Sequence, residues 1–457
     1  MKKNKRVLTF ILTMCLILTN SMGLVVSAAD SKAVDLTICP DGEDEKERDC
    51  SIPVASNGWK NWPEGPQTNG GAGIVMDAET GTILYAKNID GKAYPASITK
   101  VLTLLLALEN GKPDDIITVS EDAVYSVEYG YAHVGLEPGE EVRLEDMLYA
   151  VMLASANEAA YAVGENIGDG YESFLDQMNN RCKELGGKNS HFNNTNGMED
   201  PQHYTTARDM ALITRELLMN HPEFEEICQT LQYTIPGTNI TDETRTFQQN
   251  HKMFYEWNPH YNEDVIAGKT GYTDVAKNTL ITCAEKDGTK LVCVVLKTHG
   301  TNVYQDTQAL LDYGFDNFSK VKLNLKDVKG SIKELPVTDT VMLPNGVDAD
   351  KVDVKIVQNK DDKSKGRLIY QYAGRQIGNA DVELSEKYIE EHETKDKKPL
   401  SPEKKKESKG MPFWAKCVLG ILGVLIIVLV VWILLAFKVR KKQLDRKRKQ
   451  KEKRKRM

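Results

Sequence analysis

Three short motifs follow one another along the middle of the chain and restrict what it can fold into. They read Ser-Ile-Thr-Lys at 97–100, Ser-Ala-Asn at 155–157 and Lys-Thr-Gly at 269–271. The first type recurs at 319–322 and 401–404, whereas the other two occur once each. Together they carry a hydroxyl nucleophile, two amines and an amide. The sequence therefore predicts a fold that gathers these distant segments into one cleft.

The first motif has the spacing expected of an activated serine. A serine hydroxyl is a poor nucleophile until a neighbouring base takes its proton. Apolar residues recur at helical spacing after Ser97, so a buried helix is predicted to open at Ser97. Residues three apart share a helix face, which places Lys100 beside the Ser97 hydroxyl. The amide of Ser97 would lie among the unpaired N–H groups of the helix start, where an oxyanion develops.

The remaining patterns indicate strands on either side of a helical middle. Predicted strands are 72–77, 82–86, 281–284 and 291–296, and predicted helices are 144–152, 158–167, 209–219 and 306–313. The second motif, with Ser155 and Asn157, falls at the break between two of these helices. Strands at both ends of the region imply one antiparallel sheet. From 321 onward only short β-like runs follow, at 322–324, 352–357, 367–372 and 376–382, which predicts a small β domain.

The two ends of the chain have the composition of export and membrane segments. Residues 1–29 read as a signal peptide, with basic residues before an apolar run and small residues near Ala28. Residues 417–437 contain no charge, and the 20 residues after them contain 13 Lys or Arg. This pattern predicts a single transmembrane helix, an extracellular bulk and a cytoplasmic basic tail at 438–457. The tail favours anionic lipid over nucleic acid, and the exported part is acidic, so no nucleic-acid partner is expected.

Two further segments and the cysteines complete the expected organisation. Residues 30–70 form an acidic flank expected to lack regular structure, and 385–416 form a solvated linker. Cys39 and Cys50 are able to close a small loop by a disulfide. Cys283 and Cys293 lie on neighbouring predicted strands, where they are either paired or small buried hydrophobes.

The motifs and their surroundings resemble the low-molecular-weight penicillin-binding proteins that act as D-alanyl-D-alanine carboxypeptidases. The resemblance covers roughly residues 70–380. The stretches that carry it are Gly-Ile-Val-Met-Asp-Ala-Glu-Thr-Gly at 73–81, Pro-Ala-Ser-Ile-Thr-Lys at 95–100, His-Tyr-Thr-Thr-Ala at 203–207 and Lys-Thr-Gly-Tyr-Thr-Asp at 269–274. It implies an α+β fold of the β-lactamase/transpeptidase type: an antiparallel sheet with a helical cluster at 71–318, then a small β domain at 319–384 and the C-terminal transmembrane helix.

The resemblance also implies a reaction and a role for each motif residue. Ser97 would attack the peptide bond between the two terminal D-alanines of a peptidoglycan stem, with Lys100 as base and Ser155 as proton relay. The other roles are substrate binding: Asn157 for the substrate amide, Lys269 and Thr270 for the terminal carboxylate, Gly271 for room beside the strand, and the Tyr272 amide, with that of Ser97, for the oxyanion. No cofactor or metal is implied, and β-lactam antibiotics are the expected inhibitors.

Two departures from the family pattern concern substrate recognition. Many relatives place an arginine just before the last helix of this domain, where the chain reads Asn-Val-Tyr-Gln at 302–305. Carboxylate binding is therefore expected to depend on Lys269, Thr270 and Lys297. The polar stretch 241–262 contains several aromatic residues that are expected to pack a loop. His203, although within a family motif, is expected to be structural.

Proteins with other functions also contain this kind of reactive serine, which leaves two alternatives to the carboxypeptidase. A β-lactamase would need a Glu-x-x-Leu-Asn motif, which the sequence lacks. The alternative from a different class is a membrane-tethered penicillin-binding sensor or a non-catalytic wall-binding protein. The short basic tail is too small to fold into the effector domain that a sensor carries.

Overall fold

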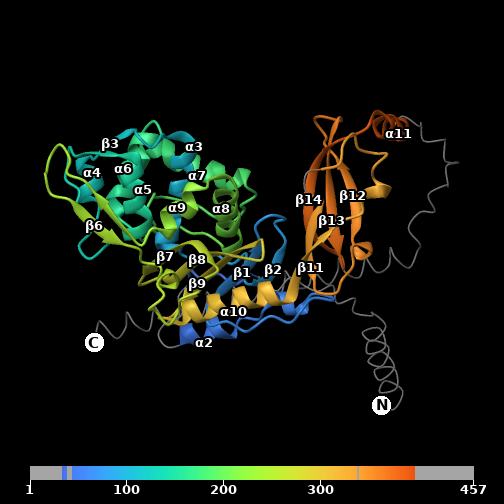
Figure 1. The fold of residues 1–457 in the computed structure, drawn as a ribbon, viewed down its shortest axis with the longest axis horizontal. Helices are drawn as coiled ribbons and strands as arrows, with labels where there is room; N and C mark the ends of the chain where they lie inside the picture. Colours follow the sequence, from blue (N-terminus) through green and yellow to red (C-terminus); the bar gives the residue numbers. More distant parts are fainter. Residues whose placement is uncertain (1–32, 39–43, 337–338, 397–457) are drawn as a thin grey trace, which may run out of the picture. The chain divides into compact units, whose positions relative to one another are not determined.

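The computed structural model describes residues 33–38, 44–336 and 339–396 (Figure 1). The predicted signal peptide at 1–29, the predicted transmembrane segment at 417–437 and Cys39 lie outside these ranges. Of the helices within the described ranges, none has the length and apolar character needed to cross a bilayer.

A five-stranded antiparallel sheet lies at the centre of the larger domain. Its strands follow the order β2-β1-β9-β8-β7. Their bounds are β1 Ala72–Asp77, β2 Ile83–Lys87, β7 Val265–Thr273, β8 Lys277–Lys286 and β9 Thr289–Thr298. Strand β1 pairs with β9 along its whole length, with Ile74 opposite Val294. The prediction that strands from both ends of the region share one antiparallel sheet is therefore confirmed.

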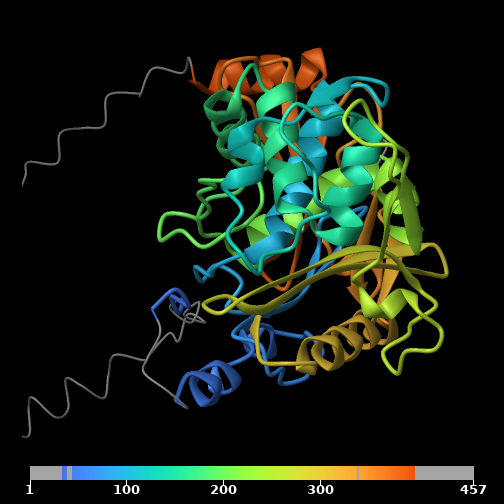
Figure 2. The same ribbon diagram turned by 90° about the vertical axis from the view of Figure 1, so that its left-hand side faces the viewer.

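Both faces of this sheet are covered by helices. Helix α10 (Asn302–Asn317) packs on one face, and a helical cluster covers the other (Figures 1 and 2). Successive side chains of a strand point to opposite faces. Accordingly, Cys283 belongs to the core under the helical cluster and Cys293 to the core under α10. Both thiols are buried and unpaired, so they act as small buried hydrophobes and the disulfide alternative is wrong.

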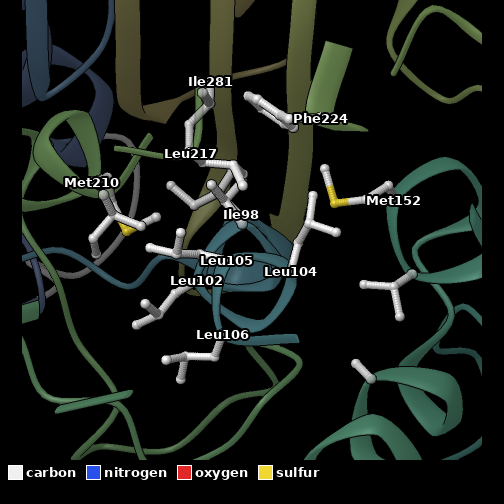
Figure 3. Close-up of a cluster of buried hydrophobic side chains, with 14 of the residues drawn as sticks. Ile98, Leu102, Leu104, Leu105, Leu106, Met152, Met210, Leu217, Phe224 and Ile281 are labelled. Atoms are coloured by element: carbon white, nitrogen blue, oxygen red, sulfur yellow. The ribbon is translucent and has the colours of Figure 1, made fainter. Parts of the chain in front are cut away.

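The helical cluster is formed by the chain between β2 and β7. It comprises α3 Lys100–Asn110, α4 Glu121–Tyr125, α5 Leu144–Tyr149, α6 Asn157–Ile167, α7 Tyr171–Glu184, α8 Ala207–Asn220 and α9 Glu223–Gln229, with the hairpins β3 Ile116–Thr118/β4 Glu141–Arg143 and β5 Gln232–Ile235/β6 Arg245–Gln248. Helix α3 runs through its middle, where Leu102, Leu104 and Leu105 are fully buried. In Figure 3, Leu102 and Leu105 lie on the side of Met210 and Leu217 of α8, and Leu104 lies on the side of Met152. Every residue of α3 from Lys100 to Ala107 is buried, so the surrounding helices and sheet hold Lys100, its first residue, in a fixed position.

The N-terminal flank is more ordered than its composition predicted. Helix α2 spans Asp44–Ser51, inside the segment expected to lack regular structure. The prediction fails because a few apolar side chains anchor the flank: Leu36 is fully buried and Ile52 nearly so. In addition, Arg48 pairs with the buried carboxylate of Asp49. Local charge density was therefore a poor guide to order here.

The small β domain follows α10 directly. Its strands are β10 Phe318–Lys322, β11 Thr340–Pro344, β12 Asp353–Gln358, β13 Lys365–Tyr372 and β14 Arg375–Glu383, and α11 Glu386–Asp396 comes after them. Strands β10 and β11 pair, and β12-β13-β14 form a second antiparallel sheet. The predicted short strand at 322–324 is mostly misplaced, since β10 ends at Lys322. Trp62 joins the two domains into one compact unit by contacting the rings of Phe318 and Tyr372.

Candidate active site

Ser97 lies in a 3-10 turn, η2 (Ala96–Thr99), that continues directly into α3. The sequence predicted an α-helix from Ser97, but the α-helix begins at Lys100. The tighter turn follows from Ala96, whose φ of +52° turns the chain sharply before the serine. Gly197 packs on this turn so closely that a Cβ there would lie 1.9 Å from the Ala96 carbonyl oxygen. Ser97 therefore lies on a turn whose conformation is fixed by contacts with neighbouring segments of the chain.

His203 is one of the groups that hold this turn. Its Nδ1 accepts a hydrogen bond from the Asn193 amide (2.9 Å), so Nε2 carries the proton and donates to Thr99 Oγ1 (2.8 Å). Thr99 Oγ1 in turn donates to the Ala96 carbonyl (2.9 Å). Burial lowers the pKa of His203 to about 3, so the ring is neutral near pH 7. These contacts support a structural role for His203, as expected from the sequence.

The Lys100 amine lies beneath the serine and is completely buried. Its Nζ is 3.1 Å from Ser97 Oγ, and it donates to Asn157 Oδ1 (2.8 Å) and to the Asn196 carbonyl (2.7 Å). Burial, and then the charge of Lys269, hold the pKa of Lys100 well below its ordinary value of 10.5, against the opposing effect of Glu158. The surroundings thus disfavour the charged form of this amine.

The second motif occupies the break between α5 and α6. A π-helical turn, η3 (Ala150–Ala154), ends at Ser155, which has a left-handed φ of +61° and is buried. A left-handed serine costs strain, of order 1–3 kcal/mol, and such residues are typically held by their surroundings at functional sites. Asn157, the first residue of α6, donates through Nδ2 to the Ala132 carbonyl (2.9 Å) while its Oδ1 accepts from Lys100. The predicted helix break is therefore present, and Asn157 links it to Lys100.

The third motif lies on β7, at the edge of the central sheet. The side chain of Lys269 is 1% exposed, and its Nζ donates to the Thr270 carbonyl (3.0 Å). Burial lowers the pKa of Lys269 to about 7. One residue before it, Gly268 lies against the ring of His251, since a Cβ there would come within 2.9 Å of that ring. Lys269 is therefore part of a strand whose neighbours pack closely around it.

Gly271 allows β7 to approach the nucleophile turn. A Cβ at this position would lie 2.4 Å from Thr279 Oγ1, 3.0 Å from the Ser97 amide nitrogen and 3.1 Å from that of Ile98. The sequence predicted that Gly271 leaves room for substrate beside the strand. The structure gives another reason for the glycine, because any side chain would push β7 away from Ser97.

A cleft of about 470 Å³ opens above these residues. Six of the eight predicted site residues line it: Ser97, Ser155, Asn157, Thr270, Gly271 and Tyr272. Lys100 and Lys269 are buried and are not part of its lining, but Lys100 contacts the lining residues Ser97 and Asn157. The fold thus brings the three motifs together, as their order in the sequence predicted.

The structure also reveals cleft residues that the sequence reasoning missed. The Asn196 carbonyl holds Lys100, and Asn250, Lys252, Thr301 and the loop 130–132 line the cleft. Nothing in the sequence singles out these positions, because they come from loops with no motif of their own. The aromatic stretch 241–262 was expected only to pack a loop, yet it supplies two of them.

The prediction for Lys297 is wrong. Its amine forms a salt bridge with Glu45 of α2 (2.5 Å) and donates to the Val275 carbonyl (2.6 Å). Lys297 does not contribute to the lining of the cleft in the part of the chain that the structure describes. This error has the same origin as the failure to predict order in the N-terminal flank. The partner of Lys297 lies on α2, the helix that the composition of the flank did not predict.

Comparison with known proteins identifies the family to which the chain belongs. Residues 60–300 match the model of a family described as D-alanyl-D-alanine carboxypeptidase. The D-alanyl-D-alanine carboxypeptidase DacF of Bacillus subtilis is 32% identical over 305 residues, which cover 62% of this chain and 74% of that relative. DacA of Haemophilus influenzae is 27% identical over 351 residues, covering 70% and 85% respectively.

Solved structures extend the likeness to the fold. The Streptomyces K15 DD-transpeptidase superimposes with a TM-score of 0.51 at 27% identity, covering 56% of this chain and all of that structure. Penicillin-binding protein 6B of Escherichia coli gives a TM-score of 0.56 at 25% identity and covers 71% of this chain and 98% of that one. The latter likeness extends well beyond the stretch matched by the family model.

Proposed function

Because this chain belongs to the D-alanyl-D-alanine carboxypeptidase family, we propose that its reaction proceeds through an acyl-enzyme on Ser97. The activity itself follows from the family and its relatives: the protein is a serine-type D-Ala-D-Ala carboxypeptidase of cell wall metabolism. Its substrate is the stem peptide of peptidoglycan. The roles of the individual residues in this reaction are our assignment.

In the acylation step, Ser97 Oγ attacks the carbonyl carbon of the penultimate D-alanine and its proton passes to Lys100 Nζ. The amides of Ser97 and Tyr272 receive the oxyanion of the tetrahedral intermediate. The C–N bond then breaks, and the proton is passed through Ser155 to the departing amine of the last D-alanine. Asn157 orients the substrate amide, and Thr270 meets its carboxylate.

In the deacylation step, a water molecule attacks the ester on Ser97. Lys100 takes a proton from this water and Ser97 regains its own, which releases the shortened stem peptide. A β-lactam ring presents a carbonyl to the same serine, so we propose that penicillins acylate Ser97 and are released slowly. Fluorescent penicillin should then label the wild-type protein and leave Ser97→Ala unlabelled.

The observation that carries this assignment is the arrangement around Lys100 Nζ. A neutral amine has two N–H donors and one lone pair. Asn157 Oδ1 and the Asn196 carbonyl are two pure acceptors, and the Ser97 hydroxyl, at 3.1 Å, is able to donate. The arrangement therefore suits a neutral lysine that receives the serine proton, which is the form that burial also favours.

The direct test is release of D-alanine from a pentapeptide ending in D-Ala-D-Ala. The full-length protein in detergent should release D-alanine, and Ser97→Ala should not. Penicillin labelling of Ser97 without any release of D-alanine would contradict the carboxypeptidase assignment. It would favour a penicillin-binding sensor or wall-binding protein instead.

We further propose that the protein is exported and held at the membrane by a single C-terminal span, with the catalytic domain outside and the C-terminus in the cytoplasm. The support is the uncharged run at 417–437, the basic residues after it and the signal-like residues 1–29. Protease added to intact protoplasts should digest the catalytic domain and spare a tag at the C-terminus. Digestion of the tag, or protection of the domain, would refute this topology.

A further inference from the structure

The cleft needs a group that recognises the carboxylate at the end of the substrate. The chain has no arginine at 298–305, which covers the residues just before α10 and its first turn, and Lys297 is engaged by Glu45. Lys269 is buried and its pKa is lowered to about 7. A different cation at the surface of the cleft would meet this need.

Lys252 lies at the surface of the cleft, and its neighbours fix it there. It opens the 3-10 turn η4 (Lys252–Phe254), and the residues on either side of it are fully buried. The ring of His251 contacts Thr282 Oγ1 through Nε2 (3.0 Å), and Met253 packs in the core under α10. With both neighbours anchored inward, the exposed side chain of Lys252 borders the cleft.

The surroundings of Lys252 favour an anion. Among the described residues that line the cleft, none is acidic and Lys252 is the single cation. Its ammonium has no salt-bridge partner within the described part of the chain and lies 5.8 Å from the centre of the Tyr304 ring. Thr301 lines the same cleft and immediately precedes α10, so the positive end of that 16-residue helix adds to the field. Thr270, the residue after Lys269, lines the same cleft.

We propose that Lys252 is a specificity-determining residue that binds the C-terminal carboxylate of the stem peptide and takes the place of the missing arginine. This inference rests on the proposed function, because it concerns the substrate of the Ser97 reaction. The ammonium of Lys252 pairs with the carboxylate while Thr270 offers its hydroxyl. Peptides without a terminal charge gain nothing from Lys252.

The test compares two substrates and four forms of the full-length protein. One substrate is an N-acylated pentapeptide ending in D-Ala-D-Ala, and the other is the same peptide as its C-terminal amide. For Lys252→Met, kcat/KM for the free acid should fall by about tenfold or more, as expected for loss of a charge-assisted contact, whereas kcat/KM for the amide should change less than about twofold. Lys252→Arg should retain the preference for the acid, and Lys329→Met, an exposed lysine of the small β domain, should behave as wild type.

Each outcome bears on one claim. If kcat/KM for the acid and for the amide fell by the same factor in Lys252→Met, or if neither changed, the role of Lys252 would be overturned. The thermal midpoint of Lys252→Met should match that of wild type, because the side chain is exposed. Release of D-alanine by Ser97→Ala would instead overturn the proposed function.

Discussion

The central sheet and the small β domain are both antiparallel, but the pKa values of their lysines shift in opposite directions. Strand β9 is buried almost throughout because helices cover both faces of its sheet, whereas β13 alternates between exposed and buried side chains. In the first region, burial lowers the pKa of Lys100 and Lys269. In the second, the partner carboxylate of Glu383 raises the pKa of the exposed Lys333.

The difference shows what the two-sided covering of the sheet provides. A solvent-exposed lysine such as Lys333 stays charged, and its ion pair contributes little. A lysine beneath a sheet edge that is packed against η2 and α9 loses solvation, and desolvation disfavours its charged form. The larger domain is therefore able to hold an amine ready to accept a proton, and the small β domain is not.

The largest effect is expected at the serine itself. The chain offers a matched control, because the Ser-x-x-Lys motif recurs in the small β domain at Ser319, on an exposed position of β10. Ser97→Ala should lower kcat/KM for D-alanine release by at least about 10⁴-fold, as removal of a nucleophile does. Ser319→Ala should leave it unchanged. Comparable activity in both variants would contradict the assignment.

Replacing the lysine of each Ser-x-x-Lys motif should give nearly as large a difference in activity. Lys100→Met removes the proposed base, and general-base catalysis typically contributes about 10²- to 10⁴-fold. We therefore expect a loss of about 10³-fold in the rate of acylation by a fluorescent penicillin. Lys322→Met, at the same place in the second copy of the motif, should acylate at the wild-type rate. A fast Lys100→Met enzyme would show that another group takes the proton.

Two glycines provide a third contrast. Gly271→Ala forces β7 away from Ser97, since its new Cβ would meet Thr279 Oγ1 and the Ser97 amide. Activity should fall by about 10²-fold, the scale of losing one oxyanion donor, and unfolding by urea should show a loss of about 1–3 kcal/mol from overpacking. At Gly330, in the small β domain, a Cβ meets nothing within 4 Å. Gly330→Ala should therefore be neutral, and equal effects at both sites would refute the close approach.

The smallest effect concerns stability in acid. Burial lowers the pKa of His203 to about 3, below its ordinary value of 6.5. As the pH falls below about 6.5, the unfolded chain takes up a proton that the folded chain refuses, so stability is lost between about pH 6.5 and 3. The small β domain between 318 and 384 contains no histidine.

Urea unfolding at pH 7.5 and pH 5 should reveal the loss of stability that His203 causes. His203→Gln should reduce the stability lost between the two pH values by about 1–2 kcal/mol, since one pKa unit corresponds to about 1.4 kcal/mol. His133→Gln, at an exposed position, should not reduce it. A wild-type pH dependence in His203→Gln would mean that the ring is protonated in the folded protein.

The sequence predicted those parts of the structure that depend on local pattern. The apolar spacing after Ser97 placed the nucleophile helix to within one turn, and the break at Ser155 was correctly located. It did not predict what depends on distant contacts. Helix α2 is ordered by Leu36 and by its salt bridge to Lys297, and Lys252 borders the cleft because the core holds His251 and Met253.

The central claim is that burial keeps Lys100 neutral beside Ser97, and a heteronuclear NMR titration of the lysine side chains tests it most directly. The signal of Lys100, assigned by its loss in Lys100→Met, should report a neutral amine in the resting enzyme well below the ordinary lysine pKa of 10.5. A Lys100 amine that stays fully protonated above about pH 9 would contradict the account.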